Sequence, residues 1–487
     1  MMWEARYDRL FIGGRWVPAH GEHLRIVSPF TEEVVAEVPS ASSSDIDRAV
    51  AAAREAFDNG PWPRMPLEAR MAVLRELRRL LAERQEPIAQ LITGEMGCPI
   101  TQSRAIQAAN PVRVIDACLD LALDYPFRSI RRAETGSALV TREPVGVVAA
   151  VVPWNVPMSI SVQKVVPAVL AGCTVVLKPA PQTALDAYLL GELIERAGFP
   201  EGVVNIVPAE RESSEHLVAH QGVDKVSFTG STAAGRRIAA LCGNDLRRVT
   251  LELGGKSAAL VLDDADLDRT VEAMRLGAFR NNGQVCTLKT RVLVSEARQA
   301  ELVERLRSLI DSMPVGSPYD EATQIGPLVS HRQRETVEHY IATGLKEGAT
   351  LVTGGGRPEG LDRGWFVEPT LFTGVRPDMT IAQEEIFGPV LSVMTYRDEA
   401  DAVEIANNSP YGLSGAVFTS DSRRGLELAS RIRTGVVELN GHPVGLKAPF
   451  GGFKASGIGR EYGHEGLDAY TELKSIGLPP DMATSFA

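Results

Sequence analysis

Between residues 145 and 262, short runs of apolar and β-branched residues alternate with stretches that have the spacing of amphipathic helices. The runs are VGVVAAVV (145–152), TVVLK (174–178), VVNIV (203–207), KVSFT (225–229) and AALVL (258–262). Strands that are apolar throughout and separated by helices are typical of a parallel sheet covered on both faces. Ligands of such sheets bind at the carboxyl ends of the strands. We therefore expect a functional site where these runs end.

A second alternating series continues to about residue 440, with helical spacing near 267–280, 297–312 and 329–347. A chain of 487 residues is too long for one hydrophobic core, so the sequence predicts two α/β units.

Two further segments have strand propensity but fit neither core, so we expect them to pair with each other and to form an oligomer contact. The expected division of the chain is a Rossmann-like parallel-sheet domain (1–120 and 144–253), a second α/β domain (254–440), a small β extension for oligomerisation (121–143 and 466–487) and a glycine-dense loop that lines a cleft (441–465).

The composition argues against several classes of protein. A net charge of -11, without a concentrated basic block, argues against nucleic-acid binding. The longest apolar run, at 145–153, is too short to span a bilayer, and the first residues lack the apolar core of a signal peptide. Five scattered cysteines without a C-x-x-C motif predict neither a disulfide framework nor a thiolate metal site. We expect a cytoplasmic protein with a small-molecule partner, no nucleic acid and no membrane.

His216 and His220 are four residues apart, a spacing found in zinc-binding helices. The H-E-x-x-H motif requires a glutamate after the first histidine, and Leu217 occupies that position. No third ligand is apparent in the sequence. We interpret this segment as a solvated helix face and expect no metal.

Polar residues and glycines follow the predicted strands. Lys178 ends the second run, where it either extends into solvent or donates hydrogen bonds to ribose hydroxyls. Asn155 lies between a tryptophan and Val-Pro, where it either forms a simple turn or points its amide into a cleft. In FTGSTAAG (228–235), Gly230 and Gly235 flank a turn before a helix, which is either structural or a phosphate site at the helix N-terminus.

Three more positions carry unusual chemistry for their surroundings. Glu252 lies in an apolar segment, where it is either half of a buried ion pair or a carboxylate tuned for proton transfer. Cys286 lies in the polar segment RNNGQVCTLKTR (280–291), although most cysteines are buried among apolar residues. Glu385 precedes a predicted strand and is either solvated or an acceptor for a ribose diol.

Seven motifs occur together in one order: PWN with Asn155, KPAPQTA with Lys178, FTGSTAAG, LELGGKS with Glu252, GQVC with Cys286, EEIFGPV with Glu385, and PFGGFKASGIGRE. In these motifs and their order the chain resembles the aldehyde dehydrogenase superfamily, NAD(P)-dependent enzymes that oxidise aldehydes to carboxylic acids. The resemblance runs from FIGGRW near residue 11 to GRE at 459–461. It implies that the first domain binds the cofactor and that the second is catalytic.

The resemblance also implies the catalytic roles. Cys286 matches the nucleophile, which must be exposed in a cleft with its thiolate favoured by the surroundings. Asn155 matches the side-chain donor of the oxyanion hole, with the backbone N–H of Cys286 as the second donor. Glu252 matches the base that activates water to hydrolyse the thioester intermediate, for which a raised pKa is suitable. Lys164 and Glu461 match positions that relay the proton outward.

For the cofactor, the resemblance places Lys178 at the adenosine ribose, Ser231 at the pyrophosphate and Glu385 at the nicotinamide ribose. The expected cofactor-binding residues are Trp154, Lys178, Gly230, Ser231, Gly235, Gly254, Glu385 and Phe387.

Two departures from the family pattern concern the choice between NAD and NADP. NAD-preferring members often carry a glutamate three residues after the lysine, and Pro181 occupies that position here. The next turn offers Arg211, which could accept a 2′-phosphate, although Glu210 and Glu212 flank it. We expect NAD, with NADP left open.

Two alternatives compete with hydrolytic aldehyde oxidation. In the acylating branch of the family, coenzyme A takes the acyl group, but that branch often lacks the glutamate found here as Glu252. A non-catalytic scaffold with the same fold is the other alternative, and the joint retention of Asn155, Glu252 and Cys286 argues against it.

The residues around the motifs are mostly apolar and medium-sized, which predicts a neutral aliphatic, terpenoid or aromatic aldehyde. Lys447 either attracts a carboxylated aldehyde, such as a semialdehyde, or is a surface lysine. The resemblance also implies a homodimer or homotetramer. The expected substrate-pocket residues are Val156, Ser159, Ile160, Val285, Thr287, Leu288, Leu446 and Phe450.

Overall fold

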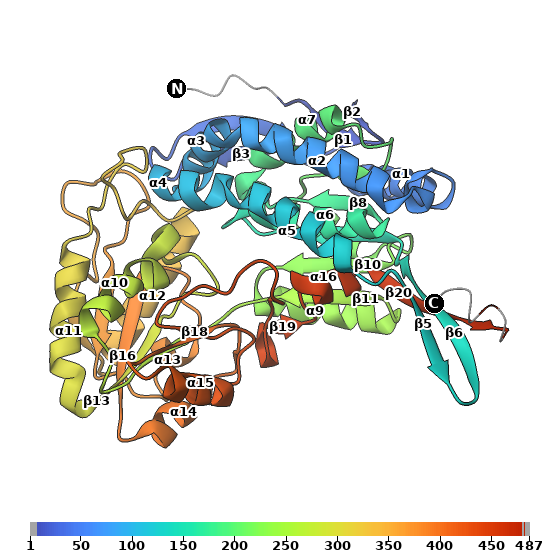
Figure 1. The fold of residues 1–487 in the computed structure, drawn as a ribbon. Coiled ribbons are helices and arrows are strands. Elements are labelled where there is room, and N and C mark those ends of the chain that lie inside the picture. Colours follow the sequence, from blue (N-terminus) through green and yellow to red (C-terminus); the bar gives the residue numbers. More distant parts are fainter. Residues whose placement is uncertain (1–6, 480–481, 483–487) are drawn as a thin grey trace.

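In the computed structural model, which describes residues 7–479 and residue 482, the first strand series builds an eight-stranded sheet (Figure 1). Its central five strands are parallel, and the remaining three pair antiparallel at the edges. In spatial order the strands are β19 (Gly457–Ile458), β11 (Arg248–Glu252), β10 (Lys225–Thr229), β7 (Val147–Val151), β8 (Thr174–Lys178), β9 (Val204–Ile206), β1 (Arg9–Ile12) and β2 (Arg15–Pro18). The predicted α/β class with a Rossmann-like parallel sheet is confirmed.

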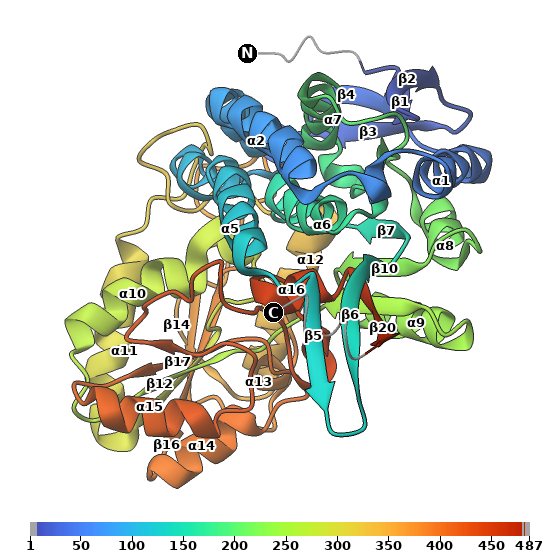
Figure 2. The ribbon, with the colours of Figure 1, turned by 45° about the vertical axis from the view of Figure 1, so that its right-hand side comes forward.

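Helices cover both faces of this sheet, which is why β7 and β8 are buried at every residue. Successive side chains of a strand point to opposite faces. In β7, Val147 and Ala149 therefore pack against one helical layer, and Val148 and Ala150 against the other. Figure 2 shows the two layers on opposite sides of the sheet. One consists of α1 (Ser43–Asp58), α8 (Arg211–Ala219) and α9 (Thr232–Asn244), and the other of α2 (Leu67–Glu83), α5 (Asn110–Asp124), α6 (Pro157–Ala171) and α7 (Leu185–Ala197).

The second strand series forms a separate seven-stranded sheet that is parallel except at β14. Its order is β14 (Thr350–Thr353), β15 (Thr370–Thr373), β16 (Val390–Tyr396), β13 (Arg291–Ser295), β12 (Ala258–Val261), β17 (Gly415–Phe418) and β18 (Glu438–Leu439). The helices of this unit are α10 (Leu267–Phe279), α11 (Glu296–Asp311), α12 (His331–Lys346), α13 (Thr380–Gln383), α14 (Glu399–Asn407) and α15 (Ser422–Arg431).

The run at 258–262 was placed last in the first alternating series, although the expected division begins the second unit at residue 254. Its strand, β12, lies in the second sheet, and β11, which was not among the predicted runs, contributes to the first sheet. The chain crosses between the sheets at Gly254 and Gly255. A side chain at Gly255 would place its Cβ 2.5 Å from the carbonyl oxygen of Cys286, so only glycine allows this close crossing.

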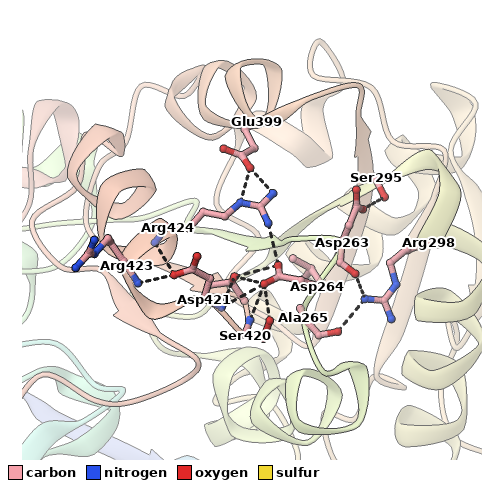
Figure 3. Close-up of polar contacts among 12 residues, drawn as sticks. Asp263, Asp264, Ala265, Ser295, Arg298, Glu399, Ser420, Asp421, Arg423 and Arg424 are labelled. Atoms are coloured by element: carbon pink, nitrogen blue, oxygen red, sulfur yellow. Dashed lines mark hydrogen bonds and ion pairs between the residues drawn. The ribbon is translucent and has the colours of Figure 1, made fainter.

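The carboxyl ends of β12 and β17 are closed by a polar network centred on Asp264 (Figure 3). Its carboxylate accepts hydrogen bonds from the Thr419 hydroxyl at 2.8 Å and from the Ser420 N–H at 3.0 Å, and it pairs with Arg424 at 3.2 Å. Arg424 also donates through Nε to Glu399 at 2.6 Å. Partial burial raises the pKa of Asp264, but hydrogen bonds from Ser420 and Thr419 outweigh this effect and lower the pKa to about 2. The polar residues that follow run 258–262 are therefore engaged in contacts within the protein.

A three-stranded antiparallel sheet projects from the body of the protein (Figures 1 and 2). It consists of β5 (Arg128–Ala133), β6 (Gly136–Pro144) and β20 (Thr471–Leu478), so the segments 121–143 and 466–487 pair through β6 and β20. Residues 480–481 and 483–487 of the expected oligomer segment lie outside the described residues. None of the helices described here is both long and apolar enough to cross a bilayer.

The other strands and α-helices are β3 (His23–Val27), β4 (Val34–Pro39), α3 (Gln85–Met96), α4 (Ile100–Gln102) and α16 (Gly463–Asp468).

We predict that Asp264→Ala lowers the stability of the protein by about 1–3 kcal/mol, because several donors that converge on the carboxylate lose their partner. The thermal unfolding midpoint, followed by circular dichroism, should fall by several degrees. Asp378→Ala is the matched control: this aspartate forms only an exposed ion pair with Arg376 at 3.2 Å, and its loss should change stability by less than about 0.5 kcal/mol. Equal midpoints for the two variants would contradict the importance of the network.

Candidate active site

A cavity of about 250 Å³ lies where the carboxyl ends of the first sheet meet the segments that precede the strands of the second sheet. Residues after β7, β10 and β11 contribute to its lining, as do residues before β13 and β16. Eight of the predicted site residues line it, namely Trp154, Asn155, Gly230, Ser231, Gly254, Cys286, Glu385 and Phe387. The structure thus brings together side chains that are far apart in the sequence.

The chain reaches Cys286 through a left-handed turn. Asn281, Asn282 and Gly283 have φ values of 53°, 59° and 77°. Residues other than glycine and asparagine rarely adopt this left-handed backbone conformation. The asparagine amides hold this backbone in place: Asn281 donates to the carbonyl of Asn155 at 2.9 Å, and Asn282 donates to the carbonyl of Pro327 at 2.8 Å. The amides that stand before the cysteine in the sequence therefore position it.

Asn155 is buried next to the cysteine segment. Its side-chain N–H donates to the backbone carbonyl of Gln284 at 2.9 Å, which fixes the orientation of the amide. A carboxamide nitrogen carries two hydrogens, so one N–H remains for an acceptor in the cavity. This arrangement favours the second of the two interpretations of Asn155, an amide directed into a cleft.

Cys286 is half-buried, and its surroundings do not favour the thiolate. Burial raises the pKa of the Cys286 thiol to about 12, the carboxylates of Glu385 and Glu252 raise it further, and Arg280 acts in the opposite direction. The expectation that the protein's own side chains favour the charged form was therefore wrong. The physical reason is that desolvation and two nearby negative charges outweigh one positive charge.

The basic residues on either side of the cysteine have different partners. Lys289 forms an ion pair with Glu438 at 2.6 Å, which compensates its charge. The Arg280 guanidinium donates to the hydroxyl of Thr287 at 2.9 Å. Arg280 is therefore the flanking cation that acts on the thiol.

Glu252 ends β11 as a buried carboxyl group. Neither of its carboxylate oxygens has a hydrogen-bond partner among the described residues. Burial raises the pKa of Glu252 well above its usual value, and Glu461 raises it further, while Lys164 and Arg460 act in the opposite direction. Of the two interpretations from the sequence, the absence of a direct ion-pair partner in the described structure favours the carboxylate tuned for proton transfer.

Lys164 and Glu461 come together as a buried ion pair. Lys164 Nζ lies 2.6 Å from one carboxylate oxygen of Glu461, and Gln163 donates to the other oxygen. Lys164 Nζ also approaches the hydroxyl of Ser227 at 3.3 Å. Backbone hydrogen bonds of 2.7 Å in both directions tie Glu461 to Phe450. The pair lies beside Glu252, and a role as a proton relay stays a prediction.

The opposite wall of the cavity carries Glu385 and Phe387. Burial raises the pKa of Glu385 to about 7, opposed by the N–H of Gly255, which donates to the carboxylate at 2.9 Å, and by Lys256. The Phe387 ring packs edge-on against the Trp154 indole with centroids 5.4 Å apart. Together they offer a hydrogen-bond acceptor and an aromatic surface.

Four lining residues were not predicted: Pro153, Thr229, Leu253 and Gln333. The first three adjoin predicted residues at strand ends, so the signal was available in the sequence. Gln333 donates to the carbonyls of Phe387 at 2.9 Å and Ile386 at 3.2 Å, which supports the left-handed φ of 57° at Phe387. Nothing local indicates this role, because Gln333 and Phe387 are 54 residues apart.

Some predicted cofactor residues lie outside this cavity. Burial lowers the pKa of Lys178, at the end of β8, to about 8, with Glu210 acting in the opposite direction. Gly235 is explained by packing, since a Cβ there would lie 2.5 Å from the side chain of Leu253. Its predicted contact with a cofactor is therefore not needed to account for the glycine.

None of the predicted substrate-pocket residues lines the cavity around Cys286. Val156, Val285 and Thr287 adjoin Asn155 and Cys286 in the chain. Ser159 is buried, and its hydroxyl donates to the carbonyl of Gln107 at 3.4 Å, away from solvent. Ile160 and Leu446 pack against the first core, and Leu288 is buried. Phe450 is partly exposed, and its ring contacts that of Tyr462.

His216 and His220 have the third polar partner that the sequence did not reveal. Asp47, on α1, lies 2.6 Å from His216 Nε2 and 3.3 Å from His220 Nε2. The Nδ1 atom of His220 accepts the N–H of Gly222 at 2.9 Å, so in the neutral ring the proton is on Nε2, pointing to Asp47. A metal at that nitrogen would displace this proton. Asp47 is thus the third group that was not apparent in the sequence, and its carboxylate and the two histidine rings lie close enough together to hold a metal ion as well as to form hydrogen bonds.

Comparison with known proteins gives a consistent picture. Residues 16–476 match the family model described as the aldehyde dehydrogenase family. A geranial dehydrogenase of Castellaniella defragrans is 45% identical over 97% of this chain and 99% of its own length. A 3-succinoylsemialdehyde-pyridine dehydrogenase of a Pseudomonas species is 40% identical over 96% and 98%. Among solved structures, a Mycobacterium tuberculosis aldehyde dehydrogenase complexed with NAD+ has a TM-score of 0.96 at 45% identity, covering 98% of this chain and 99% of that chain.

We predict that Glu385→Gln accelerates alkylation of Cys286 by iodoacetamide at pH 8 by roughly three- to tenfold. With a pKa of about 7, Glu385 is mostly ionised at that pH, and its negative charge disfavours the thiolate. Removing the charge lowers the pKa of the thiol and raises the thiolate fraction. The rate is measured by mass spectrometry of the peptide that contains Cys286.

Glu384→Gln is the matched control, because this neighbouring carboxylate accepts a hydrogen bond from Tyr340 at 2.7 Å and is not among the groups that act on Cys286. An unchanged rate in Glu385→Gln, or an equal acceleration in both variants, would contradict the electrostatic explanation.

Proposed function

This chain belongs to the aldehyde dehydrogenase family, and we propose that it oxidises an aldehyde to a carboxylic acid with NAD in the cavity around Cys286. Membership of this family, which the seven motifs predicted, is confirmed by the family match over residues 16–476. The observation that carries the proposed site is that Asn155, Cys286 and Glu385 line one cavity, with Glu252 close enough to influence the pKa of the thiol.

The residues present fit a dinucleotide. Ser231 caps the N-terminus of α9 by accepting the N–H of Ala234, and the N–H groups of Thr232 and Ala233 before it remain near the cavity for a pyrophosphate. Glu385 is a buried acceptor suited to ribose hydroxyls, and Phe387 with Trp154 forms an aromatic wall. A Cβ at Gly254 would lie 2.3 Å from Glu385, so glycine keeps this wall free of a side chain. NAD, when bound, supplies the hydride acceptor.

In the proposed first step the ionised sulfur of Cys286 attacks the aldehyde carbon, a C–S bond forms, and the carbonyl oxygen takes the negative charge. The free N–H of Asn155 and the backbone N–H of Cys286 would stabilise this oxyanion. Arg280 is the cation that favours the thiolate against two carboxylates. Loss of hydride from the carbon then leaves a thioester on Cys286.

In the second step water hydrolyses the thioester. Glu252 would take a proton from water as the new C–O bond forms, and the C–S bond breaks to release the acid and the Cys286 sulfur. Its unpartnered oxygens support this role, because no hydrogen bond within the described structure must be broken first. We propose that the Lys164–Glu461 pair carries the proton onward.

The unpartnered carboxylate of Glu252 also distinguishes hydrolysis of the thioester from transfer of the acyl group to coenzyme A. A buried carboxylate that no described residue neutralises directly is suited to activating water, whereas transfer to coenzyme A would not require it. The scaffold alternative is disfavoured because a structural protein gains nothing from the unpaired buried carboxyl of Glu252, which costs free energy.

We infer that NAD is preferred over NADP. Glu210 occupies the N-cap position of α8 without a capping hydrogen bond from its side chain, and its charge acts on Lys178. A negative charge next to the lysine expected at the adenosine ribose would repel a 2′-phosphate. Glu210 could thus compensate for Pro181, which replaces the glutamate often found in NAD-preferring members.

Oligomerisation and location follow as proposals from other parts of the chain. The sheet of β5, β6 and β20 exposes Leu473 and Ile476 on its edge strand β20, which supports its use in a homodimer or homotetramer. All five cysteines are free, which supports a reducing, cytoplasmic compartment.

We predict that Cys286→Ala lowers the rate of NADH formation from an aldehyde by at least about a thousandfold, because the nucleophile is lost. NAD binding, measured by isothermal titration calorimetry, should persist. Cys118→Ala, which removes a free cysteine on α5, is the control and should retain turnover within about twofold. Turnover by Cys286→Ala at the wild-type rate would remove the proposed nucleophile.

We predict that Glu252→Gln produces a burst of about one NADH per active site and then stalls, because hydrolysis of the thioester loses its base. Mass spectrometry should find the acyl group on Cys286. In the wild-type enzyme, added coenzyme A should leave the steady-state rate unchanged. A strict requirement for coenzyme A would instead support the acylating alternative.

A further inference from the structure

The carboxylate of Glu461 is held by two consecutive residues of α6. Lys164 Nζ lies 2.6 Å from its Oε1 atom, and the side-chain amide of Gln163 donates to its Oε2 atom. All three residues are buried. Both oxygens of this carboxylate therefore have a donor, whereas those of Glu252 have none among the described residues.

The amide of Gln163 is oriented by Tyr462. The Tyr462 hydroxyl donates to the side-chain oxygen of Gln163 at 2.7 Å. If the amide turned over, its oxygen would face the Glu461 carboxylate and its nitrogen would face the phenol. Burial raises the pKa of the Tyr462 phenol well above its usual value, and Glu461 raises it further, so the hydroxyl keeps its proton and remains a donor. Tyr462 thus selects the orientation in which the nitrogen of Gln163 faces Glu461.

The backbone keeps Tyr462 in this place. Its φ of 57° is left-handed, a conformation that costs free energy for a residue with a large side chain. Its ring packs against that of Phe450 with centroids 6.1 Å apart. Phe450 exchanges backbone hydrogen bonds of 2.7 Å with Glu461 in both directions. The residue that orients the amide and the carboxylate that the amide holds therefore belong to one tied segment.

The same segment lies against Glu252. In the pairing of β11 with β19, Glu252 is opposite Gly457. A Cβ at Gly451, the residue after Phe450, would lie 2.6 Å from a carboxylate oxygen of Glu252. The chain that carries Glu461 is thus fixed next to the proposed base.

The charge of Glu461 acts on Glu252. Burial raises the pKa of Glu252 well above its usual value, the carboxylate of Glu461 raises it further, and Lys164 and Arg460 act in the opposite direction. The titratable and charged groups around Glu252 are Glu461, Lys164, Arg460, the Cys286 thiol and the Tyr462 phenol. Among them Glu461 is the carboxylate, so the place where its charge is held affects how strongly Glu252 binds a proton.

We propose that Gln163, oriented by Tyr462, is a positioning residue for hydrolysis: it holds the charged carboxylate of Glu461 beside Glu252 and so makes Glu252 a stronger base toward water. The inference rests on the proposed aldehyde oxidation and deepens its second step. Gln163 exchanges no proton in this step. Glu252 takes the proton of water, the water oxygen bonds to the acyl carbon, and the bond from that carbon to the Cys286 sulfur breaks.

The test is the pH dependence of thioester hydrolysis in Gln163→Met, which keeps the length of the side chain and removes the amide. The acyl group on Cys286 is followed by rapid quenching and mass spectrometry after the first turnover. The hydrolysis rate should rise with pH as Glu252 loses its proton. In the variant the charge of Glu461 is held less well, so the midpoint of this rise should move to lower pH by roughly half a unit. At high pH the rate should fall by roughly three- to tenfold, because Glu252 is then a weaker base.

Tyr462→Phe removes only the hydroxyl that orients Gln163, so it should move the midpoint in the same direction by a smaller amount. Tyr125→Phe is the matched control: its hydroxyl donates to Asp468 at 2.6 Å, and it is not among the groups that act on Glu252. This control should keep the wild-type midpoint. In all three variants the first equivalent of NADH should form within about threefold of the wild-type rate, because it precedes hydrolysis.

A purely structural role of Gln163 would slow hydrolysis equally at every pH without moving the midpoint, and that result would overturn the proposal. A midpoint that moves to higher pH would overturn it as well. A shift in Gln163→Met without one in Tyr462→Phe would support the role of Gln163 and refute that of Tyr462.

If Gln163→Met does not fold, the midpoint of Tyr462→Phe decides: a lower midpoint supports the proposal, and an unmoved one refutes it. A wild-type protein that forms no NADH from any aldehyde would refute the proposed function itself. Normal formation of the first NADH with an unmoved midpoint would refute this inference alone.

Discussion

The position of Cys286 depends on three consecutive left-handed residues, Asn281, Asn282 and Gly283. Such a backbone is strained for residues with a side chain, and it persists only where the surroundings hold it. Here the two asparagine amides provide that support through backbone carbonyls on distant segments. One of those carbonyls belongs to Asn155, so the turn that places the sulfur also ties it to the proposed oxyanion donor. The geometry of the site is thus built into the backbone before any ligand binds.

The electrostatics of the cavity follow from how the two sheets meet. Carboxyl ends of strands in the first sheet bring Asn155 and Glu252, and segments before strands in the second sheet bring Cys286 and Glu385. Because the meeting place is desolvated, both carboxyl groups have raised pKa values, and together they raise the pKa of the thiol. In this environment, attack by the thiolate requires compensation from positive charge, and Arg280 is the protein group that offers it.

By itself, the sequence determined the α/β class, four of the five strands of the first series, the family, and the residue types at Cys286, Glu252 and Asn155. These follow from local periodicity and from motifs whose members are near each other in the chain. The tertiary structure alone decided that Gln333 supports Phe387 and that the charges around the thiol do not favour its ionised form. The physical reason is that burial and charge–charge distances depend on packing between residues remote in the chain, which no local pattern encodes.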